Sequence, residues 1–93
     1  MRRQLLRSSA FVRAARRMVR RQPRVAEDLQ KALELLAEDA FHPQLHTHKL
    51  SGQLQGSWAC SDGYDLRIVF RFVEHAATEA ILLETVGTHE EVY

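Results

Sequence analysis

The sequence has little of what marks several large classes of protein. It contains one cysteine, so no disulfide can form within the chain, and it has no cysteine-rich zinc motif. No apolar run approaches the ~18 residues of a membrane-spanning helix, and the apolar stretch near the start is too short for a secretion signal. A glycine-rich phosphate loop, a Gly-x-Ser-x-Gly motif and a His-Glu-x-x-His motif are all missing. We therefore expect a cytoplasmic protein with no membrane association.

What is present describes one ordinary folded domain. The chain has 93 residues, of which 45% are apolar and 27% are charged. This length is too short for two domains, and this composition is too apolar for bulk disorder. No repeat, linker or low-complexity segment divides the chain, so we expect residues 1–93 to form a single domain.

Charge is strongly segregated along the chain, although the formal net charge is only +1. Residues 1–24 contain nine arginines and no acid, whereas residues 25–93 contain four basic and twelve acidic residues. A guanidinium group can bind phosphate through two hydrogen bonds at once, and it suits an acidic protein surface equally well. A solvated helix face is the alternative interpretation of the same arginines.

The first half of the chain has the periodicity of two amphipathic helices. The first helix is expected to have Ser9 as its N-cap and to end at Gln22, before Pro23. The second is expected to include Pro23 in its first turn. The two apolar stripes are Phe11, Ala14, Ala15, Met18 and Val19, and Val25, Leu29, Ala32, Leu33 and Leu36. Because the joint is so short, we expect an antiparallel hairpin in which Ala14 and Ala15 allow close approach.

The second half has the alternating pattern of strands. In the clearest run, Leu66, Ile68, Phe70 and Phe72 alternate with charged positions, so one face is apolar. The expected strands are residues 48–51, 56–60, 66–72 and 79–86, with a short, poorly patterned one within 1–7. The predicted fold class is α+β, with the N-terminal helical hairpin packed on a small, mainly antiparallel sheet.

Histidines are the first candidates for chemistry. Three of the five form the pattern His42-x3-His46-x-His48, for which a metal site is conceivable. No cysteine or close carboxylate cluster completes a set of ligands, however, so we expect neither a metal nor a cofactor.

Metal-free acid–base chemistry is the other possibility. Imidazole can act as acid or base near neutral pH, and arginine can stabilise a phosphate without losing its proton. Asp65, Arg67 and Arg71 share one predicted sheet face, while His48 and His89 fall at a strand edge and in the tail. Such a set could cut RNA through attack by its own 2′-hydroxyl, and the aromatic residues Trp58, Tyr64 and Tyr93 could stack on bases. Spacing alone does not establish this activity. The alternative for Trp58 is a core position.

Four segments make the chain recognisable: His46–Gly52, Gly56–Cys60, Gly63–Phe70 and the tail Gly87–Tyr93. On these residues the sequence resembles the RelE/ParE superfamily of bacterial toxins, specifically the RelE/StbE type close to the YafQ branch. The helical hairpin and the segment Phe41-His42-Pro43 fit the same pattern, so the resemblance covers essentially the whole chain.

This resemblance implies a RelE-like, microbial ribonuclease-like fold and an enzymatic function. Such toxins of type II toxin–antitoxin systems are mRNA interferases: they enter the ribosomal A site and cut the mRNA there without a metal. A cognate antitoxin wraps and inhibits the toxin. The complex often represses its own operon, with operator DNA contacted through the antitoxin.

The resemblance also implies roles for individual residues. By position, His89 matches the principal catalytic imidazole and Arg67 matches the arginine that handles the scissile phosphate. His89 is the expected general acid, and Asp65 or His48 is the expected base, although acid and base could be exchanged. The expected substrate-binding residues are Tyr93, Arg71 and Lys49. The arginines expected to contact ribosomal RNA or the antitoxin are Arg13, Arg16, Arg17 and Arg20.

Two departures leave alternatives open. YafQ-type toxins have a further histidine where this chain has Ser61, and an aromatic residue where it has Leu66. One alternative is a ParE-like inhibitor of DNA gyrase, which needs no acid–base pair. The other is a catalytically inactive module that binds an antitoxin.

Overall fold

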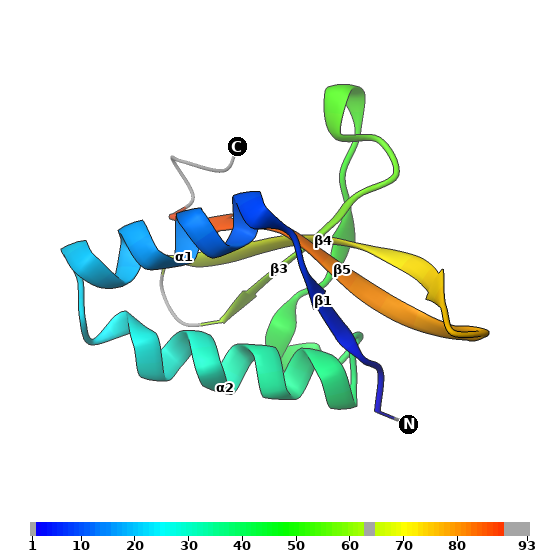
Figure 1. The fold of residues 1–93 in the computed structure, drawn as a ribbon, viewed down its shortest axis with the longest axis horizontal. Coiled ribbons are helices and arrows are strands. Elements are labelled where there is room, and N and C mark those ends of the chain that lie inside the picture. The colour runs from blue at the N-terminus through cyan, green and yellow to red at the C-terminus, as the bar shows by residue number, and fades with distance from the viewer. Residues whose placement is uncertain (1, 63–64, 89–93) are drawn as a thin grey trace.

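The computed structural model describes residues 2–62 and 65–88, and it has two helices on one side of a five-stranded sheet (Figure 1). The elements are β1 (Leu5–Arg7), α1 (Ser9–Arg21), α2 (Val25–Glu38), β2 (His48–Lys49), β3 (Trp58–Asp62), β4 (Leu66–His75) and β5 (Thr78–Gly87). Two 3₁₀ turns span Pro43–Leu45 and Gly52–Leu54. The predicted α+β class is confirmed. Within the described ranges, no helix is long and apolar enough to cross a membrane.

The sheet has the strand order β1-β5-β4-β3-β2. β1 pairs with β5 in parallel, and the other described pairs are antiparallel. β4 and β5 form a long hairpin that closes at Ala76 and Ala77, whose φ angles of 53° and 63° suit a tight two-residue turn. The strands expected at 48–51 and 56–60 prove to be 48–49 and 58–62, because residues 51–56 form a loop around the second 3₁₀ turn.

Both helices begin differently from the prediction. Ser8, not Ser9, is the N-cap of α1, and its Oγ accepts a 3.0 Å hydrogen bond from the backbone N–H of Phe11. Pro23 lies in the turn between the helices, and α2 begins at Val25 with Glu27 and Asp28 in its first turn. The acidic side chains stabilise the positive end of this helix, although its N-cap residue makes no side-chain capping bond.

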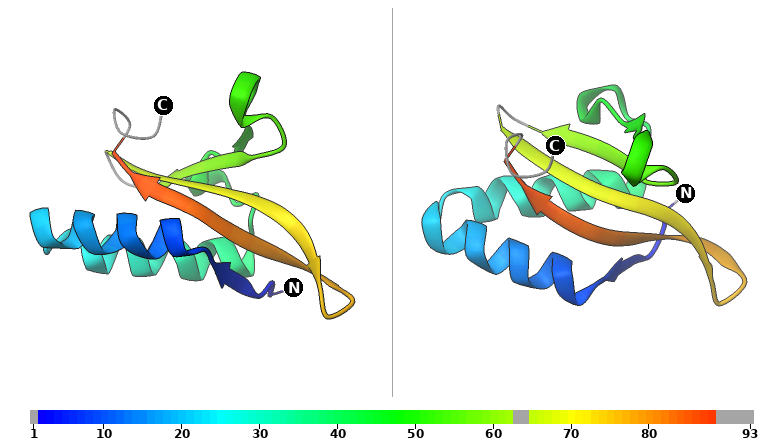
Figure 2. Two further views of the ribbon diagram at one scale, coloured as in Figure 1. Left: turned by 45° about the horizontal axis from the view of Figure 1, so that its top comes forward. Right: turned by 90° about the horizontal axis from the view of Figure 1, so that it is seen from above.

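The prediction of a closely packed helical hairpin is only partly right. The helices run in opposite directions, but they diverge from their joint (Figures 1 and 2). Side chains of both helices and of β1 line a groove between them. Ala14 is buried in the main core, whereas Ala15 lines the groove. The reason is that α1 packs chiefly on β5, so the sheet and not the other helix sets its direction.

The main core lies between the helices and one face of the sheet. Its most deeply buried large side chains are Phe70, Leu36, Leu45, Ile68, Ile81 and Leu83. Burial of this apolar surface drives the packing of helices on sheet. The other face of the sheet is turned away from both helices (Figure 2, left), and we call it the open face.

Cys60 on β3 belongs to this core and is fully buried. Burial, and to a smaller extent the nearby Asp62 carboxylate, raises the pKa of its thiol to about 12. Since the folded-state pKa exceeds the unfolded one, the buried thiol contributes full stability below the unfolded pKa. That contribution is lost as pH rises from the unfolded pKa toward 12.

We therefore expect raising the pH from 7 to 10 to destabilise the protein relative to its Cys60→Ala variant. The expected difference in unfolding free energy is on the order of 1 kcal/mol. Urea unfolding of both proteins at the two pH values measures it. All other titrating groups are common to both proteins, so their contributions cancel in the comparison. An equal loss of stability in both proteins would contradict the raised pKa of Cys60.

Candidate active site

The open face carries the predicted polar side chains in neighbouring cross-strand rows. The register places His48 of β2 opposite Ala59 of β3, which is opposite Val69 of β4. The next row contains Ser61 of β3, Arg67 of β4 and Gly87 of β5. Because side chains alternate between the faces of a strand, both rows lie on the same face. The structure thus brings His48 and Arg67 to one surface with a floor of the small buried residues Ala59 and Val69.

The ring of His48 is oriented by a neighbouring carbonyl group. Its Nδ1 lies 2.9 Å from the backbone oxygen of His46. His46 has a left-handed backbone with φ 52°, where it ends the first 3₁₀ turn. A carbonyl oxygen can only accept, so in the neutral imidazole Nδ1 carries the proton and Nε2 keeps the lone pair. This tautomer suits an exposed general base.

Arg67 supplies a fixed positive charge in the same area. It lies on β4, near the middle of the sheet, half-buried, and its Nη1 donates a 3.1 Å hydrogen bond to the carbonyl oxygen of Leu66. His48 and Arg67 lie two strand spacings and one cross-strand row apart, so their backbones are separated by about 12 Å. A guanidinium and an imidazole at this separation can engage one nucleotide segment laid across the strands.

Asp65 lies at the end of the sheet, immediately before β4 and two residues before Arg67. It lines a hollow with Asp28, Asp62 and Thr88 near the joint of the two helices. The described chain ends at Thr88, one residue after the Gly87 that pairs with Arg67. His89, Tyr93 and Tyr64 lie outside the described residues, so their predicted roles stay predictions. Among the residues described, no group of three or more histidine, cysteine and acidic side chains could hold a metal ion.

Lys49 and Arg71 are not gathered with these residues. Lys49 is paired with Trp58 on the helix side of the sheet, and its Nζ lies 5.5 Å from the centroid of the indole ring. Trp58 is half-buried against the core, in line with the core alternative for this residue. Arg71 does lie on the open face, but its guanidinium is engaged with Glu84 and Ser57.

Ser57 and Glu84 are two polar residues of this face that sequence reasoning missed. Ser57 is 3% exposed and donates a 2.5 Å hydrogen bond from Oγ to Oε1 of Glu84. Ser57 falls in the Gly-Ser-Trp segment of the resemblance, which was the one available signal for it. No local pattern marked Glu84, because the contact joins residues 27 positions apart.

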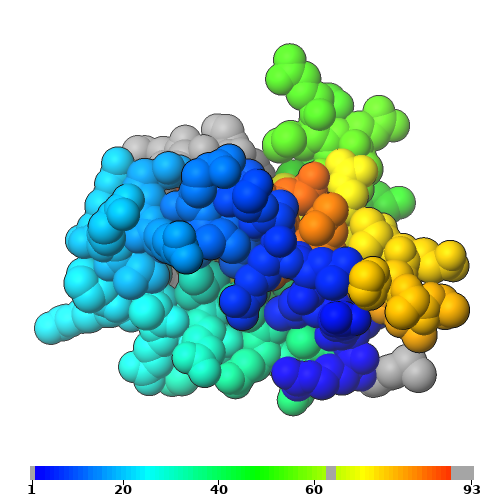
Figure 3. All heavy atoms as spheres, viewed as in Figure 1, coloured from blue at the N-terminus to red at the C-terminus, as the bar shows by residue number. Residues whose placement is uncertain are grey.

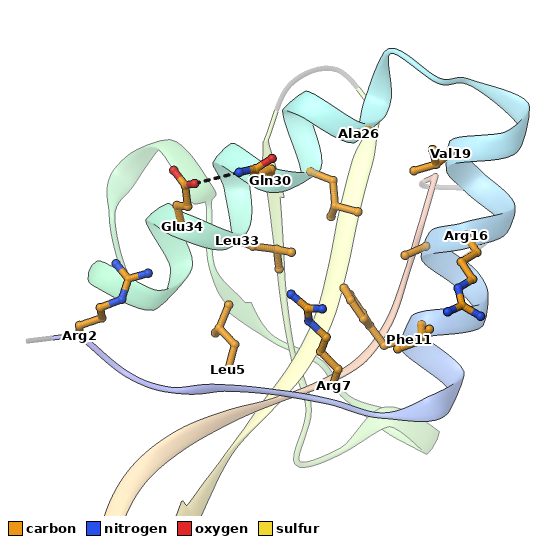
Figure 4. Close-up of a pocket in the computed structure, with 13 residues that line it drawn as sticks. Arg2, Leu5, Arg7, Phe11, Arg16, Val19, Ala26, Gln30, Leu33 and Glu34 are labelled. Carbon is orange, nitrogen blue, oxygen red and sulfur yellow. Dashed lines mark hydrogen bonds between the residues drawn. The ribbon is translucent and has the colours of Figure 1, made fainter.

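The groove between the helices is a second distinct surface (Figure 4). It has a volume of about 580 Å³. Apolar side chains from three elements line it, among them Leu5 of β1, Val12 of α1 and Leu33 of α2. Arg7 and Arg16 add positive charge to its lining. Of the four arginines predicted to contact a partner, Arg16 lines the groove, whereas Arg13, Arg17 and Arg20 are exposed on α1 outside it.

Solved structures of bacterial toxins share this architecture of two helices over a mainly antiparallel sheet. YafQ from E. coli strain BL21(DE3) is 14% identical, covers 98% of both chains and superimposes with a TM-score of 0.78. The E. coli DinJ–YafQ toxin–antitoxin complex matches at 15% identity, with 100% and 99% coverage and a TM-score of 0.76. The RelBE2 complex from Mycobacterium tuberculosis matches at 14% identity, with 96% and 100% coverage and a TM-score of 0.72.

The family model for YafQ, a bacterial toxin of a type II toxin–antitoxin system, matches residues 3–93. The chain therefore belongs to the YafQ toxin family, and the predicted RelE/YafQ-type relationship is confirmed. A comparison with curated protein sequences gives no match.

Proposed function

We propose that this toxin is an endoribonuclease that cuts mRNA in the ribosomal A site without a metal ion. The observation that carries the proposal is the presence of His48 and Arg67 in adjacent rows of one open face. A group that transfers protons and a group that stabilises phosphate charge are what cleavage of RNA by its own 2′-hydroxyl requires.

His48 is the residue that we assign as general base. Its Nδ1 faces the carbonyl oxygen of His46, so the lone pair on Nε2 can take the proton of the attacking 2′-hydroxyl. Arg67 then stabilises the charge that develops on the phosphate. His89 protonates the departing 5′-oxygen as general acid, and Asp65 is the alternative base. The products are a 2′,3′-cyclic phosphate and a 5′-hydroxyl.

The cellular test separates this activity from inhibition of DNA gyrase, the function of ParE toxins. Controlled expression of the toxin should arrest growth and leave mRNA cut within codons, without a DNA-damage response. A DNA-damage response with intact mRNA would show that the toxin inhibits DNA gyrase and is not a nuclease. If folded protein that still binds its antitoxin caused no growth arrest, mRNA cleavage or DNA-damage response, an inactive binding module would be favoured.

A cognate antitoxin is the protein partner that we propose for the groove between the helices. The structural relatives DinJ–YafQ and RelBE2 are complexes of a toxin with its antitoxin. The groove has a mainly apolar lining in which Arg2, Arg7 and Arg16 outnumber the one acid, Glu34, so it suits an amphipathic segment whose polar side is acidic. The same complex would contact operator DNA only through the antitoxin. The remaining arginines of α1 stay available for ribosomal RNA, so the ribosome and the antitoxin would use adjoining surfaces.

A matched pair of charge reversals on α1 tests this surface. Arg16→Glu should weaken antitoxin binding by about tenfold or more, because Arg16 lines the groove. Arg17→Glu changes the net charge equally on an exposed neighbour outside the groove, and it should change the affinity less than about threefold. Calorimetric titration with the cognate antitoxin measures both, and equal effects of the two variants would reject the groove as the binding surface.

A further inference from the structure

Three side chains of the open face form a closed ring of hydrogen bonds. The Oγ of Ser57 donates to Oε1 of Glu84, and the Nη2 of Arg71 donates to Oγ of Ser57 at 3.2 Å. The ring closes where Nε of Arg71 lies 3.3 Å from Oε2 of Glu84. Its members come from β4, β5 and the segment before β3, so the ring joins three parts of the chain.

Ser57 connects this ring to the loop of residues 51–56. Its carbonyl oxygen accepts a 2.9 Å hydrogen bond from the N–H of Leu50, and its own N–H donates to the carbonyl oxygen of Leu54 at 3.0 Å. Leu50, directly before the 51–56 loop, and Leu54 within it are therefore both bonded to Ser57. The guanidinium of Arg71 also lies beside Gly56, which returns the loop to the sheet with φ +93°.

Glu84 is held in place by a β-bulge. The register passes from Val69–Thr85 to Phe70–Leu83, so Glu84 is the additional residue of β5. Its carbonyl oxygen accepts a 3.2 Å hydrogen bond from Oγ of Ser8, the N-cap of α1. Glu84, whose carboxylate anchors the loop, is thus held at both its backbone and its side chain.

The 51–56 loop stands beside the candidate active site. β2, which carries His48, runs directly into it, and the loop projects from the molecule on the side of the open face (Figures 2 and 3). All six of its residues are exposed, and none of them is charged. Its amide side chains, Gln53 and Gln55, suit hydrogen bonds to the edges of unpaired bases.

We propose that Glu84, Ser57 and Arg71 are positioning residues that hold the 51–56 loop against the single-stranded RNA bound across the open face. The inference rests on the proposed nuclease function and adds a substrate-contacting loop to it. Arg71 acts here through the loop and not as a ligand of phosphate, because Glu84 already offsets its charge. This role differs from the direct substrate contact expected from sequence.

The test uses ribosomes carrying a defined mRNA, with cleavage kinetics measured for purified variants. Glu84→Ala should raise KM by about tenfold and leave kcat within about twofold, since it frees the loop but leaves the catalytic groups in place. The Gln53→Ala/Gln55→Ala double variant should raise KM similarly without lowering the melting temperature. Glu79→Ala is the matched control on β5, because it removes an ion pair with Arg3 away from the loop.

Exchange of the two charges separates positioning from direct phosphate binding. The double variant Arg71→Glu/Glu84→Arg should recover KM to within about threefold of wild type, because the ion pair is restored with reversed direction. If Arg71 instead bound phosphate directly, the exchange would not restore KM, and loss of Arg71 would reduce the salt dependence of binding. No recovery together with a reduced salt dependence would overturn the positioning role.

A second readout does not depend on cleavage. Ribosomes whose mRNA carries a 2′-O-methyl group at the scissile nucleotide cannot be cut, so they report binding alone. Glu84→Ala should bind them about tenfold more weakly and exchange the amide hydrogens of Leu50 and Ser57 faster than Glu79→Ala. Unchanged affinity and unchanged exchange would overturn the proposal. If the wild-type toxin does not cleave mRNA but Glu84→Ala still shows weaker binding and faster amide exchange, the nuclease function would be rejected instead.

Discussion

Replacement of His48 by alanine is expected to lower the rate of mRNA cleavage on ribosomes by about 10²- to 10⁴-fold. The variant removes the imidazole whose Nδ1 lies 2.9 Å from the His46 carbonyl oxygen. In the proposed mechanism, its Nε2 takes the proton of the 2′-hydroxyl. Single-turnover cleavage by purified toxin measures the loss. Added imidazole should restore part of the rate if the missing group is a base.

His75→Ala is the matched control for this experiment. His75 is an exposed histidine at the end of β4, next to the hairpin turn, and it lies at the far end of the sheet from Arg67. The His75→Ala variant should cleave mRNA at the wild-type rate. A folded His48→Ala protein with undiminished cleavage would show that His48 is not the base, and Asp65→Asn would then be the variant to examine.

Removal of the Arg67 side chain is expected to have the next largest effect, a loss of about 10²- to 10³-fold in cleavage rate. Arg67→Ala deletes the positive charge that, in the proposed mechanism, stabilises the negative charge developing on the phosphate. Arg67→Lys keeps a charge but loses the planar fork, so it should recover only part of the rate. Single-turnover kinetics on saturating ribosomes separate this loss from weaker binding.

Arg24→Ala provides the comparison, because Arg24 is an exposed arginine in the joint between the helices. Its removal should leave single-turnover cleavage within about twofold of wild type. Equal losses for Arg24→Ala and Arg67→Ala would mean that total charge, and not the position of Arg67, governs the rate.

Most of the fold could be predicted because periodicity reports directly on burial. The alternation through Ile68 and Phe70 identified β4, and the stripe through Phe11 and Met18 identified α1. The divergence of the helices could not be predicted from their stripes, because packing of α1 on β5 determines its direction. The 3₁₀ turn in the 51–56 loop likewise shortened a predicted strand without any local signal of periodicity.

The candidate site was predictable where sequence resemblance marked single residues, and not where long-range register decides. His48 and Arg67 were expected, and the register brings them to one face. Lys49 was expected beside them, but alternation along β2 turns it to the helix side. Glu84 depends on a β-bulge between distant residues, which no local pattern encodes.

The departure at Ser61 has a definite place in the structure. Ser61 lies directly opposite Arg67 in the β3–β4 register, on the open face. A histidine is expected at this position in YafQ-type toxins, so this chain has one imidazole fewer beside Arg67, the residue that we propose stabilises the phosphate. In the mechanism that we propose, proton transfer would therefore depend more heavily on His48 and His89.

The most direct test of the nuclease function is to map cuts in a defined mRNA on purified ribosomes by primer extension, with His89→Ala as the control. We expect cuts within A-site codons for wild type and none for the folded variant. Equal cutting of free RNA would reject the requirement for the ribosome. Absence of cuts from folded wild-type toxin would contradict the account as a whole.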